Sequence, residues 1–283
     1  MILWFSVLRA LPYHSAISAE QDTKGHTMKG LIDRVALITG ASRGIGAATA
    51  VLMAEAGADV AINFHSNRAA ADNVAEQVRS FGRRAEVYQA DVTSADDCRR
   101  MCEGAVADFG KVDILVNNAG IGFETYGVQP LTDTDPSTLQ AFFDYNLFGC
   151  LTLIKLLVPQ MRKQGRGDVV MISSFAAQAL RANWGPYSIS KAAMEAMAMT
   201  LAKEERPHGI RVNVVAPGLV DTEMGEGVLK VNGQLENKQA FSANAPFGFM
   251  CQPQDIAGAI VYLCSEEGRY VSGQRLTVNG GGY

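Results

Sequence analysis

From Arg34 onward, apolar and polar positions follow two alternating rhythms. Short runs rich in Val, Ile and Ala predict β-strands at 34–39, 58–63, 84–89, 112–117, 167–173, 210–216 and 274–279. Between them, longer amphipathic stretches predict helices near 45–56, 67–81, 94–109, 137–163, 187–206 and 253–264. Strands that are apolar throughout are buried on both faces, so this pattern indicates βα units around a parallel sheet.

The alternation predicts one α/β domain over residues 28–283, with a doubly wound parallel sheet of about seven strands flanked by helices. No linker rich in Pro, Gly or Ser divides it, and no internal repeat is present. In such a sheet, ligands bind beyond the carboxyl ends of the strands. We therefore expect the loops that follow the strands to carry the chemistry.

Residues 1–27 are expected to form an N-terminal extension outside the core. Their start, "MILWFSVLRALPYHSAISAEQ", superficially resembles a secretory signal. However, no basic segment precedes the apolar run, and Arg9, Pro12 and His14 interrupt it. The run is also too short to cross a bilayer. Met28, directly before "KGLIDRVALITG", is an alternative start.

Composition narrows the class of protein further. The chain has 283 residues, of which 48% are hydrophobic, and a formal net charge of −4, as expected of a globular enzyme. Lys and Arg are scattered, so no basic stripe for nucleic acid exists. The five cysteines form no CxxC and lack histidines at metal-ligand spacing, which argues against a metal site and a disulfide scaffold. We expect a cytoplasmic protein without metal, nucleic-acid or membrane partners.

A glycine-rich turn follows the first predicted strand. In "TGASRGIG", Gly40, Gly44 and Gly46 lead directly into a helix. Glycines permit positive φ and close approach of a pyrophosphate, and a helix N-terminus offers unpaired N–H groups. The turn therefore predicts a dinucleotide site, although its Gly-x3-Gly-x-Gly spacing differs from the commoner G-x-G-x-x-G.

The end of the second strand indicates which dinucleotide is bound. An NAD site usually carries an acid there that binds the ribose hydroxyls, whereas this chain reads "INFHSNR". Arg43 lies in the glycine turn, and Ser66, Asn67 and Arg68 follow the strand. These donors suit a 2′-phosphate, so we expect NADP(H) rather than NAD(H). Alternatively, Arg68 only solvates the start of a helix.

The stretch "YSISK" places a phenol and an ammonium one helical turn apart. Side chains at i and i+4 share a helix face, so Tyr187 and Lys191 can interact. A nearby cation stabilises tyrosinate and lowers the phenol pKa from its usual value of about 10. Such a pair can act as an acid near neutral pH, but the spacing also occurs on ordinary helices.

Taken together, "TGASRGIG", "NNAG" at 117–120, "SS" at 173–174 and "YSISK" resemble the short-chain dehydrogenase/reductase family over roughly residues 29–283. The resemblance implies a Rossmann-type fold. It also implies that Tyr187 is the general acid and base, that Lys191 lowers its pKa and holds the nicotinamide ribose, and that Ser174 binds the substrate oxygen. Ser173 is the less favoured serine. Asn146 matches the residue that holds a water for proton relay.

The same resemblance implies the cofactor contacts. Asp91 would contact the adenine, Asn117 and Gly120 would flank the cofactor, and Thr222 with the backbone near Val220 would bind the carboxamide. The expected set, with the two catalytic residues that it shares, is Gly40, Ser42, Arg43, Gly44, Ile45, Gly46, Asn63, Ser66, Asn67, Arg68, Asp91, Val92, Asn118, Ala119, Gly120, Tyr187, Lys191, Pro217, Gly218, Val220 and Thr222.

Substrate choice is expected to lie in the loops at 121–127, 175–185 and 224–250. The last is long for a connection and predicts a mobile lid. The resemblance is equally close to 3-oxoacyl thioester reductases and to sugar or ketone reductases. Phe249 stands where many relatives have an arginine, so contacts of that arginine are in doubt. A homo-oligomer, tetramer or dimer, is implied through the two long helices and the last strand.

The leading hypothesis is an NADP(H)-dependent oxidoreductase that interconverts a ketone or other carbonyl and a secondary alcohol. A second enzyme class is an epimerase or dehydratase that retains its cofactor. A third possibility is a non-catalytic NADP-binding regulator, although such a protein need not keep Asn146, Ser174, Tyr187 and Lys191 together. A metal-dependent alcohol dehydrogenase is disfavoured because no Cys/His ligand cluster is present.

Overall fold

The computed structural model describes residues 30–282, in which seven parallel strands form one sheet. The predicted extension at 1–27 and the alternative start at Met28 lie outside the described residues. The strand order is β3-β2-β1-β4-β5-β6-β7. The bounds are Val35–Ile38 (β1), Asp59–Phe64 (β2), Ala85–Gln89 (β3), Ile114–Asn117 (β4), Gly167–Ile172 (β5), Ile210–Pro217 (β6) and Arg275–Val278 (β7). The predicted α/β fold with seven parallel strands is confirmed.

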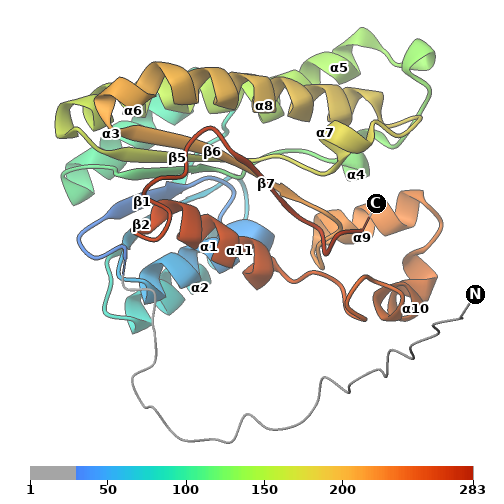
Figure 1. Ribbon diagram of the computed structural model, residues 1–283, viewed down its shortest axis with the longest axis horizontal. Helices are drawn as coiled ribbons and strands as arrows, with labels where there is room; N and C mark the ends of the chain where they lie inside the picture. Colours follow the sequence, from blue (N-terminus) through green and yellow to red (C-terminus); the bar gives the residue numbers. More distant parts are fainter. Residues whose placement is uncertain (1–29, 283) are drawn as a thin grey trace, which may run out of the picture.

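Helices cover both faces of the sheet, as Figure 1 shows. Successive strand residues point to opposite faces, so Ala36 and Ile38 join one core while Val35 and Leu37 join the other. The first core is closed by α1 (Gly44–Glu55), α2 (Arg68–Ser80) and α11 (Pro253–Cys264). The second is closed by α3 (Ala95–Phe109), α6 (Gly149–Gln164) and α8 (Gly185–Glu205).

The helix predicted at 137–163 contains a break in its α-helical pattern. It consists of α5 (Pro136–Phe143), a π-helical turn at Asp144–Phe148 and α6. Asp135 caps its start by accepting a hydrogen bond from Ser137 N, and Gly165 ends it with φ of +69°. By length and apolarity alone Pro136–Gln164 could span a membrane. Here its buried residues pack against the sheet and α3, as in the core helix of a globular domain.

Short helices occupy the loops at the carboxyl ends of the strands. They are α4 (Phe123–Tyr126), α7 (Ala176–Ala179), α9 (Glu223–Val231) and α10 (Lys238–Ala243), with 3₁₀ turns at Leu131–Asp133 and Leu235–Asn237. A further 3₁₀ turn at Arg206–His208 lies at the other end of the sheet, before β6. The segment predicted as a lid, 224–250, therefore holds most of α9 and all of α10. Figure 1 shows both helices beside the end of β7, away from the main helical layers.

A buried ion cluster ties the amino ends of the strands together. The Asp168 carboxylate lies 2.7 Å from a guanidinium nitrogen of Arg34 and 2.7 Å from one of Arg211. Arg34 also donates to the carbonyls of Cys264 and Asp113. Asp168 and Arg34 are almost fully buried. This cluster lies at the end of the sheet opposite the loops that carry α4, α7 and α9.

Candidate active site

A cavity of about 1750 Å³ opens at the carboxyl ends of the strands. Its walls come from the turn after β1 and from the loops after β2, β3, β4, β5 and β6, together with the start of α8 and the 224–250 segment. Most residues expected at the site line it: Gly40, Ser42, Arg43, Gly44, Ile45, Asn63, Ser66, Asn67, Asp91, Val92, Asn118, Ala119, Gly120, Ser174, Tyr187, Lys191, Pro217, Gly218, Val220 and Thr222.

Gly46, Arg68, Asn117 and Asn146 are expected site residues that do not line the cavity. Each takes a structural contact instead. Asn117, for example, is buried, and its amide nitrogen lies 3.2 Å from the sulfur of Met171.

The glycine-rich turn is shaped to admit a phosphate. Gly40 and Gly44 have φ of +61° and +56°, which side chains disfavour. A Cβ at Gly46 would lie 2.6 Å from the Gly40 carbonyl oxygen and from the Asn118 amide nitrogen. The N-cap residue of α1, Arg43, makes no side-chain cap bond within the described part of the chain, and an uncapped helix start offers N–H groups to a ligand. These features fit a pyrophosphate at a helix N-terminus.

Asn63 and Asn118 support this turn through their side chains. Asn63 Oδ1 accepts from Gly40 N at 3.0 Å, and its amide donates to the carbonyls of Phe64, Tyr88 and Ala90. Asn118 donates to the carbonyls of Thr39 and Gly40. The Asn63 side chain therefore binds the backbone around the turn, and the contact of Asn63 with a cofactor stays a prediction.

Side chains expected near the adenosine also make local contacts. Asn67 caps α2 by accepting from Ala70 N at 3.0 Å. Asp91 Oδ1 accepts from both N and Oγ1 of Thr93, while Asp91 Oδ2 lies 3.8 Å from His65 Nε2. Asp91 thus keeps an oxygen on the cavity side.

The two arginines expected near a 2′-phosphate both face carboxylates. Arg43 lies 3.0 Å from Glu223 at the start of α9, and both side chains are about 70% exposed. Arg68 binds Asp72 on the same helix, at 2.9 Å, and lies over the Phe64 ring. Of the two, only Arg43 lines the cavity. The contacts of Arg68 therefore fit the alternative interpretation, in which it only solvates the start of α2.

Tyr187 lies at the start of α8 inside an aromatic cluster. Its ring centroid is 4.8 Å from that of Phe123 and 6.1 Å from that of Phe142, and Trp184 packs on Phe123 at 4.6 Å. Burial raises the pKa of Tyr187 to about 12, a hydrogen bond with Ser174 opposes this rise, and the Glu124 carboxylate adds to it. The Tyr187 phenol is therefore protonated at neutral pH.

Lys191 is held by the end of β5. Its Nζ donates to the Ile172 carbonyl at 2.8 Å and lies 5.9 Å from the Tyr187 ring centroid. Burial lowers the pKa of Lys191 to about 8. We expected this ammonium to lower the pKa of Tyr187. In the structure burial outweighs any such effect, and the pKa of the phenol is raised.

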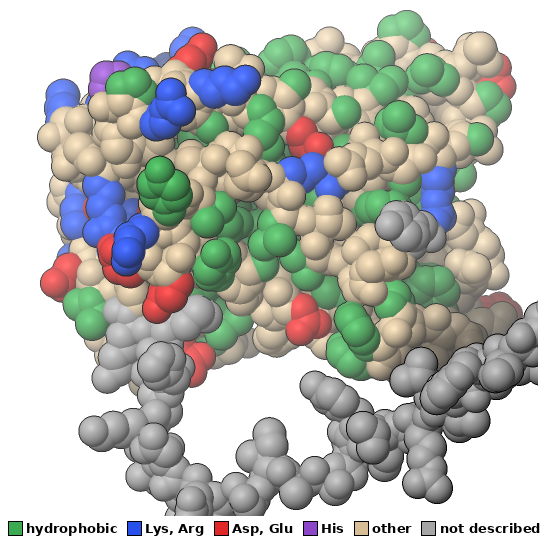
Figure 2. All heavy atoms as spheres, in the orientation of Figure 1, with side chains coloured by type: hydrophobic (Ala, Val, Ile, Leu, Met, Phe, Trp, Pro, Cys, Tyr) green, Lys and Arg blue, Asp and Glu red, His purple; other side chains and the backbone are tan. Residues whose placement is uncertain are grey.

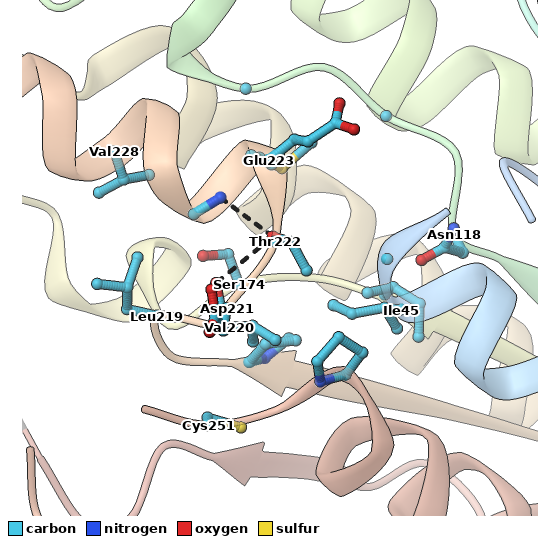
Figure 3. Close-up of a pocket in the computed structure, with 18 of the residues that line it drawn as sticks. Ile45, Asn118, Ser174, Leu219, Val220, Asp221, Thr222, Glu223, Val228 and Cys251 are labelled. Atoms are coloured by element: carbon cyan, nitrogen blue, oxygen red, sulfur yellow. Dashed lines mark hydrogen bonds between the residues drawn. The ribbon is translucent and has the colours of Figure 1, made fainter. Parts of the chain in front are cut away.

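The two adjacent serines point in different directions. Ser173 is buried, and its hydroxyl donates to Glu195 at 2.6 Å. Ser174 lines the cavity, accepts from Ala176 N at 3.1 Å and hydrogen-bonds with Tyr187. Figure 3 labels Ser174 among the residues that line the pocket, together with Val220 and Asp221 from the loop that follows β6. Both serines line the cavity, but the Ser173 hydroxyl donates to Glu195, whereas the Ser174 hydroxyl is beside Tyr187 and is the better placed of the two to bind a substrate oxygen.

Asn146 occupies the π-helical turn and is fully buried. Its side chain donates to Ser190 Oγ at 3.0 Å and exchanges longer hydrogen bonds with the backbone of Ile121. A Cβ at Gly120 would lie 2.5 Å from Asn146 Oδ1. Asn146 therefore holds the loop after β4 through the Ile121 backbone. Its side chain does not line the cavity, and its expected contact with a relay water stays a prediction.

Thr222 begins α9. Its hydroxyl accepts from Gly225 N at 3.1 Å and donates to the Val220 carbonyl at 3.4 Å, as the dashed lines in Figure 3 mark. Lys238 on α10 binds both Asp221 and Glu226, at 2.6 and 2.7 Å. These bonds connect the lid segment to the cavity rim.

Sequence reasoning missed several groups around the cavity. These are the ring of Phe142 and the ion pair between Glu195 and Arg275, whereas Phe123, Glu124 and Trp184 lie in the loops expected to choose the substrate but had no individual role assigned. Glu195 lies one turn after Lys191, so its position on the same helix face was available as a signal. The sequence carried no such signal for Arg275, because it lies 80 residues from Glu195.

Among residues 30–282, no group of three or more His, Cys, Asp or Glu side chains is arranged to hold a metal ion. The five cysteines, all within that range, are unpaired. Figure 2 shows one face of the molecule, on which Lys and Arg side chains lie close to Asp and Glu.

Comparisons with known proteins agree with this geometry. Residues 40–282 match the family model described as enoyl-(acyl carrier protein) reductase. A 7alpha-hydroxysteroid dehydrogenase from Escherichia coli (strain K12) is 36% identical over 249 residues, which cover 88% of this chain and 94% of the relative. A 3-oxoacyl-(acyl-carrier-protein) reductase from Staphylococcus aureus (strain Mu50) is 33% identical over 248 residues, or 88% of this chain and 97% of the relative.

The structural comparison gives the same result. A solved 7 alpha-hydroxysteroid dehydrogenase complexed with NADH and 7-oxo glycochenodeoxycholic acid aligns with a TM-score of 0.82 and 36% identity, covering 90% of this chain and 96% of that one. Sequence and fold thus agree over nearly all of the described residues. The chain belongs to the short-chain dehydrogenase/reductase family of oxidoreductases.

Proposed function

We propose that this protein is an NADP(H)-dependent reductase of a bulky, largely apolar ketone. The observation that carries the proposal is the convergence of Tyr187, Ser174 and Lys191 on one cavity that also receives the glycine-rich turn. When bound, the nicotinamide supplies or accepts the hydride. The protein then needs only to position the carbonyl, donate a proton and stabilise the developing negative charge on oxygen.

The three side chains divide this work. The Tyr187 hydroxyl donates its proton to the carbonyl oxygen during reduction and takes it back during oxidation. Its pKa of about 12 keeps it protonated at neutral pH, which suits the donor role. The Ser174 hydroxyl donates a hydrogen bond to the same oxygen, and the Lys191 ammonium, which also donates to the Ile172 carbonyl, would hold the nicotinamide ribose.

Two observations support NADP(H) over NAD(H). The end of β2 lacks the carboxylate that usually binds the ribose hydroxyls of NAD. In addition, Arg43 presents an exposed guanidinium at the cavity wall, and its present partner, Glu223, is equally exposed. A 2′-phosphate, which carries more charge than one carboxylate, would compete well for that guanidinium.

The cavity lining supports an apolar substrate. Its walls include a large apolar set, which is Phe123, Trp184, Met224, Val228, Phe241, Phe247 and Phe249. So many large apolar side chains favour a steroid-like or other cyclic ketone, or an acyl chain, over a sugar, because burying the hydroxyls of a sugar against them is unfavourable. The complex of the solved relative with a 7-oxo bile acid derivative is consistent with this class.

We also propose that the protein self-associates through the outer surface of α6 and α8. Phe148 and Leu151 are 46% and 38% exposed there, beside a shallow apolar groove that includes Met197 and Leu201. Light scattering during size-exclusion chromatography would test this. We expect the main species of Leu151→Glu to have a lower molar mass than that of the wild type. An unchanged molar mass would exclude this surface as the interface.

The functional proposal is tested by following nicotinamide absorbance with NADPH and, separately, NADH. The substrate panel contains cyclic ketones, steroids, β-ketoacyl thioesters and ketoses. We expect NADPH oxidation that is faster than NADH oxidation, with an apolar ketone as the best substrate. A ketose as the best substrate would refute the substrate class, and faster NADH oxidation would refute the cofactor. Tight NADPH binding without turnover of any ketone would favour a regulator.

A further inference from the structure

Glu195 and Arg275 form an ion pair beneath the proposed active site. Glu195 lies on α8, one turn after Lys191, and Arg275 is the first residue of β7. Arg275 Nε lies 2.9 and 3.0 Å from the two carboxylate oxygens. Their side chains are only 15% and 11% exposed. Removing such charges from water is unfavourable, so a pair of this kind is weak evidence for stability and calls for another explanation.

Arg275 Nη1 donates to Thr277 Oγ1 on the same strand, and the remaining hydrogen bonds of the pair go to the segment that follows β5. Glu195 accepts from the Ser173 hydroxyl at 2.6 Å, and Arg275 Nη2 donates to the Ser174 carbonyl at 3.2 Å. The residue before them, Ile172, has its carbonyl bound by Lys191. Three consecutive residues are therefore held by three charged side chains, and the third residue carries the hydroxyl that meets Tyr187.

From this arrangement we propose that Glu195 and Arg275 are positioning residues, which fix the Ser174 hydroxyl against Tyr187 for the reaction proposed above. The inference rests on that proposed function, because Ser174 matters only if a carbonyl is polarised in this cavity. Neither side chain lines the cavity, so the pair acts through the backbone of 173–174. A displacement of about 1 Å in such a group can lower the rate by on the order of 100-fold.

Variants of this pair can separate an effect on the position of Ser174 from an effect of the local charge on the rate. Glu195→Gln removes the negative charge and keeps an acceptor for the Ser173 hydroxyl, whereas Arg275→Met removes the positive charge and all three donor nitrogens of the guanidinium. The two variants change the local charge in opposite directions, but both break the link between α8 and the Ser174 carbonyl. If position is what matters, both should act in the same direction on the rate.

A second ion pair on the same helix supplies the matched control. Glu205, at the end of α8, is buried and binds Arg162 Nε at 2.8 Å. It contacts neither β5 nor the cavity in the described residues. Glu205→Gln therefore makes the same chemical change to a buried carboxylate on the same helix, without touching the segment at 172–174.

The test combines steady-state kinetics, NADPH binding by fluorescence and crystal structures of these variants. We expect kcat to fall about tenfold or more in both Glu195→Gln and Arg275→Met, with NADPH affinity within about threefold of wild type. The contact between Ser174 and Tyr187 should lengthen in both crystal structures. Arg275→Lys, which keeps the charge, should recover part of kcat. Glu205→Gln should lower thermal stability and leave kcat unchanged.

Other outcomes would overturn the inference. Crystal structures in which Ser174 stays in place would refute the positioning role even if the wild-type protein reduced no ketone, so this result is separate from a failure of the proposed function. Opposite effects of the two variants on kcat would assign the pair an electrostatic role instead. A loss of kcat in Glu205→Gln as large as in Glu195→Gln would make the effect one of general stability.

Discussion

Replacing Lys191 by Met should change how the stability of the protein depends on pH. Lys191 is 5% exposed, and burial lowers its pKa from 10.5 to about 8, against the smaller influences of Cys150 and Glu195. Below pH 8 the folded and unfolded states are both protonated, and the folded state bears the full unfavourable free energy of a buried ammonium. Between pH 8 and 10.5 the unfolded state binds more protons, so stability rises with pH.

The size of the effect follows from this shift. Each unit of pKa corresponds to about 1.4 kcal/mol, so the free energy of unfolding of the wild type should gain about 3 kcal/mol relative to Lys191→Met across this window. Most other titrating groups are common to both proteins and cancel in the difference. The variant also loses the hydrogen bond to Ile172, which lowers its stability by a similar amount at each pH.

Urea unfolding followed by tryptophan fluorescence, at several values between pH 7 and 10.5, measures this difference. Lys155→Met serves as the control, because Lys155 is exposed on α6 and its variant should track the wild type throughout. A difference between wild type and Lys191→Met that stays flat would mean that the Lys191 pKa is not lowered in the folded state. A difference that falls as pH rises would mean that this pKa lies above 10.5.

Three further substitutions test other parts of the structure. Tyr187→Phe should lower kcat by about 10²–10⁴-fold and leave NADPH binding, measured by fluorescence titration, nearly unchanged; a variant with most of its turnover would refute the acid role. Arg43→Ala should raise the KM for NADPH about tenfold or more and alter that for NADH less than about threefold, and an equal rise for both would assign Arg43 to a shared phosphate. Asp168→Asn leaves Arg34 and Arg211 buried without their anion, so the free energy of unfolding, measured by thermal unfolding, should fall by about 3–5 kcal/mol. A smaller fall than that caused by Asp72→Asn, which breaks the exposed pair with Arg68, would contradict this expectation.

Much of the fold could be predicted because its strands carry a simple signal. Each predicted strand lies within about two residues of an observed one, since continuous apolar runs such as Val35–Ile38 are buried on both faces. The glycine-rich turn and the Tyr187–Lys191 pair are local patterns as well, and both lie at the cavity. Local patterns of this kind do not require knowledge of which elements become neighbours.

The remainder depends on distant contacts or on elements too short to show a period. Helices of four residues, such as Ala176–Ala179, have no room for helical periodicity. The sequence favoured Ser174 over Ser173 only through the family resemblance; the contacts that distinguish them involve α8 and β7, and Arg275 is 80 residues from Glu195. The structural role of Asn63 is of the same kind, because its amide binds the backbone at the ends of β1, β2 and β3, which are distant in sequence.

The π-helical turn at Asp144–Phe148 joins α5 and α6 into one long helix, from Pro136 to Gln164. Because of this turn, the number of residues in the helix matters as well as their identity. An α-helix advances about 100° per residue, and a π-helical turn accommodates one extra residue within it. Deleting a single residue there would rotate α6 by about that angle relative to α5. Either Asn146 would leave Ser190 and the loop after β4, or the apolar side of α6 would leave the sheet. Evolution can therefore exchange side chains along this helix far more freely than it can shorten or lengthen it.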